Sequence, residues 1–245
     1  MASTAQRHVG VEPADGFDQR IVLLGEFAVR RNGEVLALSS DAQRLVAFLA
    51  LRRRRLPRTL VAGALWLEQS QERAYGNLRS TLWRLRRDAA SIIQADAHSL
   101  SIAPGVDVDV DRATRQARAL SGGGRNYTLE LFLEDLLPGW YDEWVLIERE
   151  RLRQQSLHAL EAIASALCDR KEHGAAVQAA LHAIRIDPFR ESAHRCLIRI
   201  HLDEGNASEA LRQFEAYRTT LAEELGLAPS PRMIELVRNA ALVSR

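Results

Sequence analysis

The chain has 245 residues, of which 47% are hydrophobic and 27% are charged, a composition typical of a soluble globular protein with room for two modest domains. Two cysteines are too few for a disulfide framework, which favours a reducing compartment. No apolar stretch is long enough to span a bilayer, and residues 1–19 lack the basic-then-apolar pattern of a secretion signal. We therefore expect a cytoplasmic protein with no membrane partner, whose first 19 residues form a disordered tail.

The net charge of +1 conceals a difference between the two halves of the chain. Residues 20–105 contain fourteen arginines and seven acidic residues, a net charge of +7, whereas residues 106–245 contain eighteen basic and twenty-two acidic residues, a net charge of −4. A basic front half is typical of a domain that binds a polyanion. The alternative is that arginine is simply abundant, since Lys171 is the only lysine and a GC-rich genome would favour arginine throughout.

The basic half begins with a predicted sheet. Residues 21–27, 29–31 and 35–38 have the composition of strands, and Asn32-Gly33 is typical of a tight hairpin turn. A second hairpin is expected later, where Ile92-Ile93 and residues 100–102 flank a polar tip.

Three helices are predicted between these hairpins. Ser40 and Asp41 can cap the first, Pro57 permits a new first turn, and the second is expected at residues 58–66, followed by a polar loop. The apolar positions of the first helix are Leu45, Phe48, Leu49 and Leu56. Those of the second are Leu60, Val61 and Leu65.

The third helix, expected at residues 73–90, carries the functional prediction. One stripe at helical spacing is apolar and should be buried: Ala74, Leu78, Leu82, Leu85 and Ala89. The opposite face presents Arg73, Gly76, Asn77, Ser80, Arg84 and Arg87, with Arg79 and Arg86 on one flank. Arginine and asparagine make paired hydrogen bonds to guanine and adenine in the major groove, and flanking arginines suit phosphates. An isolated helix of this kind could be a solvated charged face; two preceding helices and a following hairpin favour a recognition helix.

The back half is predicted to be almost entirely helical from Trp140 onward, and it contains an internal repeat. Residues 171–177 match residues 205–211 after a shift of 34, with Ala176 aligned to Ala210 and Asp187-Pro188 closing the first unit. A 34-residue helix–turn–helix period with this placement of alanine and proline is the tetratricopeptide signature. Such stacks bind other proteins on a concave face.

Other candidate sites have a simpler interpretation. The run Arg52–Arg55 either contacts phosphates or adds favourable charge at a helix C-terminus, and the sequence does not separate the two. Cys168, Cys196, His194 and His201 lack metal-ligand spacing, so core packing is favoured. No nucleophile elbow, P-loop or dinucleotide-binding turn is present. We therefore expect no catalytic residues, no cofactor and no metal.

These residues carry a family resemblance. Residues 23–27, Gln43-Arg44, residues 64–66 and residues 77–87 resemble the OmpR-type winged helix of SARP-type regulators, the antibiotic regulatory proteins of actinomycetes. The back half looks like the bacterial transcriptional activator domain, on the strength of residues 140–152, 187–194, 221–227 and 229–231. The resemblance implies a mainly α chain: an N-terminal winged helix-turn-helix with small β-sheets at 20–105, and a C-terminal tetratricopeptide-like domain at 106–245.

The same resemblance implies a function. Such proteins bind direct repeats in promoter DNA, with a second copy on the second repeat, and recruit RNA polymerase holoenzyme including its sigma factor, which implies regulation of secondary-metabolite genes. Carried over by position, the DNA-contact residues are Asn77, Ser80, Thr81, Arg84 and Arg86; the helical periodicity places Thr81 nearer the core and Arg86 on the flank.

Two positions depart from the family pattern. The wing tip has Ser99 where an arginine is usual, and Trp83 occupies a position that is usually small or polar. The altered wing leaves open a second function, in which a degenerate winged helix and the helical repeats form a protein-interaction scaffold.

Overall fold

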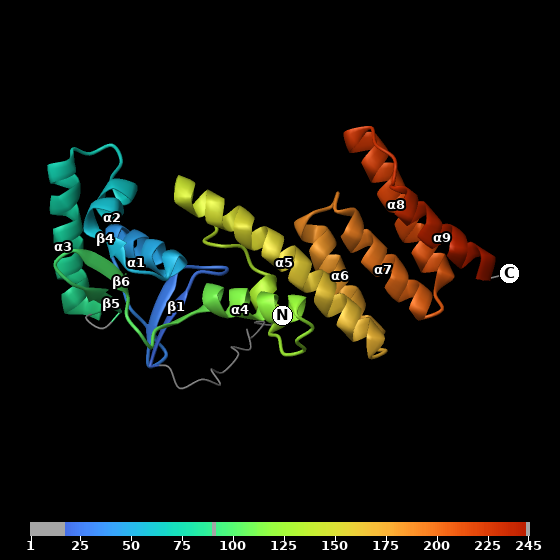
Figure 1. Cartoon of the computed structure of the whole chain (residues 1–245), viewed down its shortest axis with the longest axis horizontal. Helices are drawn as coiled ribbons and strands as arrows, with labels where there is room; N and C mark the ends of the chain where they lie inside the picture. The colour runs from blue at the N-terminus through green and yellow to red at the C-terminus, as the bar shows by residue number, and fades with distance from the viewer. Residues whose placement is uncertain (1–17, 90–91, 244–245) are drawn as a thin grey trace, which may run out of the picture. The chain divides into compact units, whose positions relative to one another are not determined.

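The computed structural model describes residues 18–89 and 92–243, which form two compact units (Figure 1). The first unit contains Ala28–Val108 and the residues up to Ile21, and the second contains Val22–Phe27 and the chain from Asp109 onward. The predicted division at 105/106 therefore differs in two ways: β7 (Asp107–Val108) pairs within the first unit, and Val22–Phe27 pack in the second. Most of the predicted tail lies outside the described residues, but Gln19 already begins β1.

The first unit contains two small sheets. β1 (Gln19–Val22), β2 (Ala28–Arg31), β3 (Glu34–Val35) and β7 form one, in the order β3-β2-β1-β7. Asn32 and Gly33 have φ values of 50° and 86°, the left-handed conformation that a tight hairpin turn requires. The predicted strand over residues 21–27 is shorter than expected, since β1 ends at Val22.

Three helices and a second sheet complete this unit. The helices are α1 (Ser40–Arg52), α2 (Arg58–Leu65) and α3 (Gln71–Ala89). β4 (Leu56–Pro57), β6 (Ser99–Ile102) and β5 (Ile93–Ala95) form an antiparallel sheet. Leu60 was expected in the core but is 44% exposed; α2 has only eight residues, and the face it buries is that of Val61, Ala62 and Leu65. The arrangement is the predicted winged helix-turn-helix.

Helices build the second unit. They are α4 (Asp109–Ser121), a 3-10 turn at Leu129–Phe132, α5 (Glu143–Asp169), α6 (His173–Ile186), α7 (Glu191–Asp203), α8 (Ala207–Leu225) and α9 (Pro231–Val243). Helices α5 to α8 follow one another side by side in Figure 1, and each packs on the next.

The backbone confirms the 34-residue repeat. At the end of α5, the N–H of Lys171 donates to Cys168 O and the N–H of Glu172 to Leu167 O. At the end of α7, Gly205 donates to Leu202 O and Asn206 to His201 O, each 34 residues later. Both turns use a left-handed residue, Lys171 (φ 63°) and Gly205 (φ 84°).

The paired helices approach closely at alanines. Ala176, Ala179, Ala180 and Ala183 on α6 are fully buried, and Ala210 on α8 is 2% exposed. Ala176 and Ala210 are thus buried as the repeat predicts, and the back half is tetratricopeptide-like.

Two polar side chains anchor irregular backbone inside the second unit. The buried carboxylate of Asp109 accepts hydrogen bonds from the backbone N–H groups of Leu23, Leu24 and Val110. Burial raises the pKa of this carboxyl to about 6, despite those three donors. The guanidinium of Arg149 donates to the carbonyl oxygens of Leu136, Leu137 and Trp140. The two residues together hold the segments before β2 and before α5.

Candidate nucleic-acid interface

Helix α3 is positioned by a tight turn and by its own apolar stripe. The backbone N–H of Gln69 donates to Trp66 O, and that of Ala74 donates to Ser70 O, so the second helix leads into the third through five residues. Ala74, Leu78, Leu82 and Leu85 are each no more than 7% exposed, as the periodicity predicts. Because this stripe packs against α1 and α2, the orientation of the opposite face is fixed.

That opposite face is exposed and positively charged. Helix α3 contains five arginines and only two acidic residues, Glu72 and Asp88. The predicted site residues that lie exposed on it are Arg73, Asn77, Arg79, Ser80, Arg84, Arg86 and Arg87. Asn77, Ser80 and Arg84 lie within one narrow stripe of the helix, with Arg79 and Arg86 to one side, because successive residues are 100° apart. The structure brings these seven side chains to one surface.

Thr81 does not belong to this surface. Its side chain is 1% exposed, and its hydroxyl has no hydrogen-bond partner among the described residues. The helical periodicity indicated this position, whereas the family resemblance placed it with the contact residues.

Trp83 is exposed on the same helix, at 66% of its surface. The guanidinium carbon of Arg87 lies 5.6 Å from the centroid of its ring, within the range of a cation–π interaction. The sequence indicates that Trp83 is an unusual residue at its position, but it does not predict the contact between the Trp83 ring and the Arg87 guanidinium.

The wing tip is closed by Asp96. Its carboxylate accepts hydrogen bonds from the hydroxyl of Ser99 (2.7 Å) and from the backbone N–H groups of His98 and Ser99 (2.8 and 2.7 Å). The Ser99 hydroxyl and these two N–H groups lower the pKa of Asp96 to about 2. Ser99 therefore helps to order the turn between β5 and β6.

Arginines at and after the end of α1 make hydrogen bonds and an ion pair within the first unit. Arg53 ends the helix in a left-handed conformation (φ 45°) and donates to Val106 O. Arg55 forms an exposed ion pair with Asp96, and Arg58 donates to Asp96 O. These contacts connect the base of the recognition helix-turn-helix to the wing.

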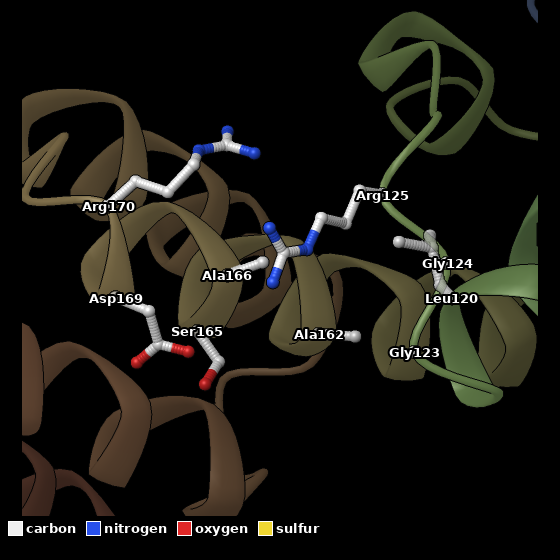
Figure 2. Close-up of a pocket in the computed structure, with 9 residues that line it drawn as sticks. All are labelled: Leu120, Gly123, Gly124, Arg125, Ala162, Ser165, Ala166, Asp169 and Arg170. Carbon is white, nitrogen blue, oxygen red and sulfur yellow. The ribbon is translucent and has the colours of Figure 1, made fainter.

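The second unit contains a surface hollow of about 490 Å³ between α5 and the chain that follows α4 (Figure 2). Figure 2 shows the guanidinium groups of Arg125 and Arg170 above it, and Ser165 with Asp169 at another edge. Arg170 donates to Glu172 and to the Tyr127 hydroxyl. The hollow thus combines both signs of charge, with one of its arginines already paired.

Core packing was expected for two histidines and two cysteines; of these, His201 is partly buried, with its side chain 15% exposed and 3.9 Å from Glu204. His194 is 5% exposed, hydrogen-bonded to Pro188 O and Gln213, and Cys196 packs against the main core of this unit, as core packing predicts. Cys168 packs against the same core and also lies beside His173 and Asp203, a grouping that the sequence did not predict. No helix among the described residues combines the length and the apolar character that a bilayer crossing needs.

Comparison with known proteins gives the family. The sequence profile of the bacterial transcriptional activator domain matches residues 107–239. The chain is 30% identical, over 237 residues, to the "Regulatory protein AfsR" of Streptomyces coelicolor, and 27% identical, over 246 residues, to that of Streptomyces griseus. These matches cover 89% and 91% of this chain but only 24% of each relative, so the chain spans about a quarter of their length.

A solved structure shares the fold. Mycobacterium tuberculosis EmbR, in complex with a low-affinity phosphopeptide, superimposes with a TM-score of 0.74 at 20% identity, over 92% of this chain and 65% of that one. The winged helix-turn-helix and the helical repeats therefore occur together in that protein. On the profile match and the similarity to the AfsR regulators, the chain belongs to the bacterial transcriptional activator domain family and is a transcription regulator of the SARP type.

Proposed function

We propose that the chain binds promoter DNA in a sequence-specific manner through α3 and activates transcription by recruiting RNA polymerase. The exposed basic face of α3 carries this proposal, because its opposite stripe is fixed in the core. A helix of this kind fits the major groove, where side chains can distinguish all four base pairs.

Within that face the residues have different roles. Asn77, Ser80 and Arg84 contact base edges, since they share one narrow stripe of the exposed face. Arg79 and Arg86, on the flank, contact phosphates, as do Arg73 and Arg87 at the two ends of the exposed face. Thr81 supports the helix from the core side and makes no base contact, because it is buried.

The wing positions the domain without entering the minor groove. Ser99 lacks the guanidinium that a narrow minor groove attracts, and its hydroxyl is already bonded to Asp96. Arg55 and Arg58, which hold the wing, lie close enough to it to contact the DNA backbone on that side.

The helical repeats supply the activating function. We propose that the second unit contacts the holoenzyme, including its sigma factor, and that two copies bind direct repeats of one promoter. The match of the second unit to the bacterial transcriptional activator domain supports its activating role, and the resemblance to SARP-type regulators implies genes of secondary metabolism as the targets. Transcription regulation by this chain requires no catalytic group, and we propose that it is not an enzyme.

A protein-interaction scaffold is the second candidate, favoured by the wing that lacks an arginine. A multi-round transcription assay with purified holoenzyme separates the two. The regulator should increase transcript from a template with two direct half-sites and leave a template with scrambled half-sites unchanged. Polymerase binding without any dependence on the half-sites would favour the scaffold.

A further inference from the structure

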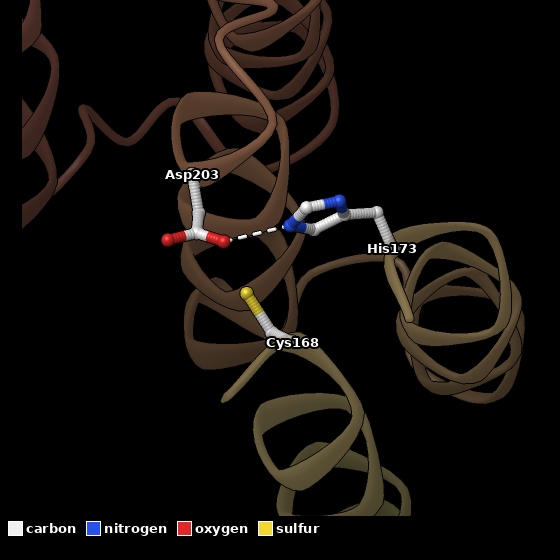
Figure 3. Close-up of side chains that lie close together, drawn as sticks. All are labelled: Cys168, His173 and Asp203. Atoms are coloured by element: carbon white, nitrogen blue, oxygen red, sulfur yellow. Dashed lines mark hydrogen bonds and ion pairs between the residues drawn. The ribbon is translucent and has the colours of Figure 1, made fainter. Parts of the chain in front are cut away.

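Three potential metal ligands from three helix ends meet in the second unit (Figure 3). Cys168 lies in the last turn of α5, His173 is the first residue of α6, and Asp203 is the last residue of α7. The Cys168 sulfur, an imidazole nitrogen of His173 and a carboxylate oxygen of Asp203 all lie within 4.8 Å of one another. Figure 3 shows the thiol and the imidazole both directed toward the carboxylate.

The spacing of the three atoms is close to that of a tetrahedral site. Bond lengths of 2.0–2.3 Å to zinc put neighbouring ligand atoms about 3.3–3.8 Å apart. His173 Nε2 and Asp203 Oδ2 are 2.7 Å apart, so they would separate by about 1 Å or less, and the thiol, within 4.8 Å of both atoms, would approach them by about 1.5 Å at most. Rotation of half-buried and exposed side chains at helix ends can supply such movements.

The chemistry of the donors selects the class of ion. A thiolate and an imidazole favour zinc and other late first-row ions over magnesium or calcium, and a carboxylate completes a three-ligand set with one open position for water. The side chains of His173 and Asp203 retain some exposure to solvent, 19% and 35%, so an ion can reach them.

We propose that Cys168, His173 and Asp203 form a binding site for a divalent late transition metal of the zinc class, which clamps the ends of α5, α6 and α7. The site joins consecutive helices of the repeat at the turn that includes Lys171. Binding would therefore stabilise the stack on which the second unit is built, independently of whether α3 binds DNA.

The competing explanation is an ion-pair cluster that needs no metal. Lys171 Nζ lies 2.8 and 2.9 Å from the two carboxylate oxygens of Asp203, and the imidazole of His173 also contacts that carboxylate. In that case Lys171 would be a partner of Asp203 in the same way as His173 is. In the metal site, Lys171 is a competitor for Asp203, and its removal should strengthen binding.

The test is a Co²⁺ titration of the reduced, untagged full chain, followed by absorption spectroscopy. We expect a thiolate-to-cobalt charge-transfer band at one equivalent, which Zn²⁺ abolishes by displacement. Cys168→Ser should remove the band, whereas the matched variant Cys196→Ser should keep it, since Cys196 is not one of the three grouped ligands and its thiol lies 3.9 Å from Glu161 O.

Three further variants complete the test. His173→Gln and Asp203→Asn should weaken Co²⁺ binding about tenfold or more. Lys171→Met should tighten it about two- to fivefold, the usual strength of an exposed ion pair. Zn²⁺ should also raise the Tm of the wild type and not that of Asp203→Asn. Absence of the band in the wild type with excess Co²⁺, or its persistence in Cys168→Ser, would overturn the proposal.

Discussion

Asp109 offers the sharpest test of how the second unit is held together. Its carboxylate accepts three backbone N–H groups, from Leu23 at 2.8 Å, Leu24 at 2.9 Å and Val110 at 2.7 Å. Asp109→Ala leaves these donors without their acceptor, at about 1–3 kcal/mol each. Relief of the buried charge offsets about 3 kcal/mol, because the pKa is raised from 3.8 to about 6. We therefore expect a net loss of about 0–6 kcal/mol, centred on about 3 kcal/mol, in the free energy of unfolding.

Asp109→Asn is the matched variant, because it keeps one oxygen that can serve Leu23 and Leu24 and removes the charge. Its loss at neutral pH should stay below about 2 kcal/mol, the cost of leaving only the Val110 N–H unpaired. Urea unfolding, followed by a signal from the second unit, measures both variants.

The pH dependence of the same variants has a definite sign. The folded state holds the Asp109 proton more tightly than the unfolded state does, since burial raises its pKa. The wild type should therefore lose stability relative to Asp109→Asn as the pH rises from about 4 to about 6, with no further change above that window. A difference that is flat across this range, or an Asp109→Ala variant as stable as Asp109→Asn, would refute the reasoning.

The remaining predictions concern the repeat, the loop before α5 and the DNA surface. Ala210→Arg should destabilise the second unit by about 3 kcal/mol or more, because it forces a charged side chain between packed helices. The control Ala216→Arg, at an exposed position of the same helix, should leave the Tm nearly unchanged. Arg149→Ala should lower the free energy of unfolding in urea by about 2–4 kcal/mol, because three carbonyl oxygens lose their donor. Arg151 is more exposed, so Arg151→Ala should lower it by less than about 1 kcal/mol. Equal losses would contradict the anchoring role of Arg149. In an anisotropy titration at increasing salt, the logarithm of the affinity for duplex DNA should fall linearly with the logarithm of the salt concentration, with a slope of about −0.9 per phosphate contacted. Arg79→Ala should reduce the magnitude of that slope by about 1, whereas Arg238→Ala in the second unit should leave it unchanged. A slope near zero would exclude an electrostatic interface.

The sequence predicted the elements that depend on local periodicity. The apolar stripe of α3 could be identified because its spacing is helical over the whole element, and the same spacing fixed which arginines are exposed. The 34-residue shift identified Ala176 and Ala210 as close-approach positions, because two repeats that pack their helices in the same way need small residues at the same positions.

Contacts between distant segments could not be predicted in this way. Residues 106–111 alternate apolar and acidic side chains, a pattern that usually exposes the acids, yet Asp107 and Asp109 are 6% and 4% exposed. Asp109 is buried because its carboxylate accepts hydrogen bonds from the backbone N–H groups of Leu23 and Leu24, more than eighty residues earlier in the chain.

The cluster of Cys168, His173 and Asp203 has the same origin. Its members are separated by 5 and 30 residues, a spacing that matches no metal motif, and only the return of α7 beside α5 and α6 brings them together. Thr81 shows the converse error, in which positional similarity to a family assigned a contact to a side chain that the core holds.

Selection of bound duplexes from a random pool, with wild type and Arg84→Ala in parallel, tests the DNA-binding surface most directly. The wild type should enrich two directly repeated half-sites. Arg84→Ala should enrich the same half-sites with the preference lost at one base pair of each, a cost of about 1–3 kcal/mol on the specific site. An unchanged motif from Arg84→Ala would show that α3 is oriented differently on DNA. Failure of the folded wild type to enrich any sequence would contradict sequence-specific binding itself.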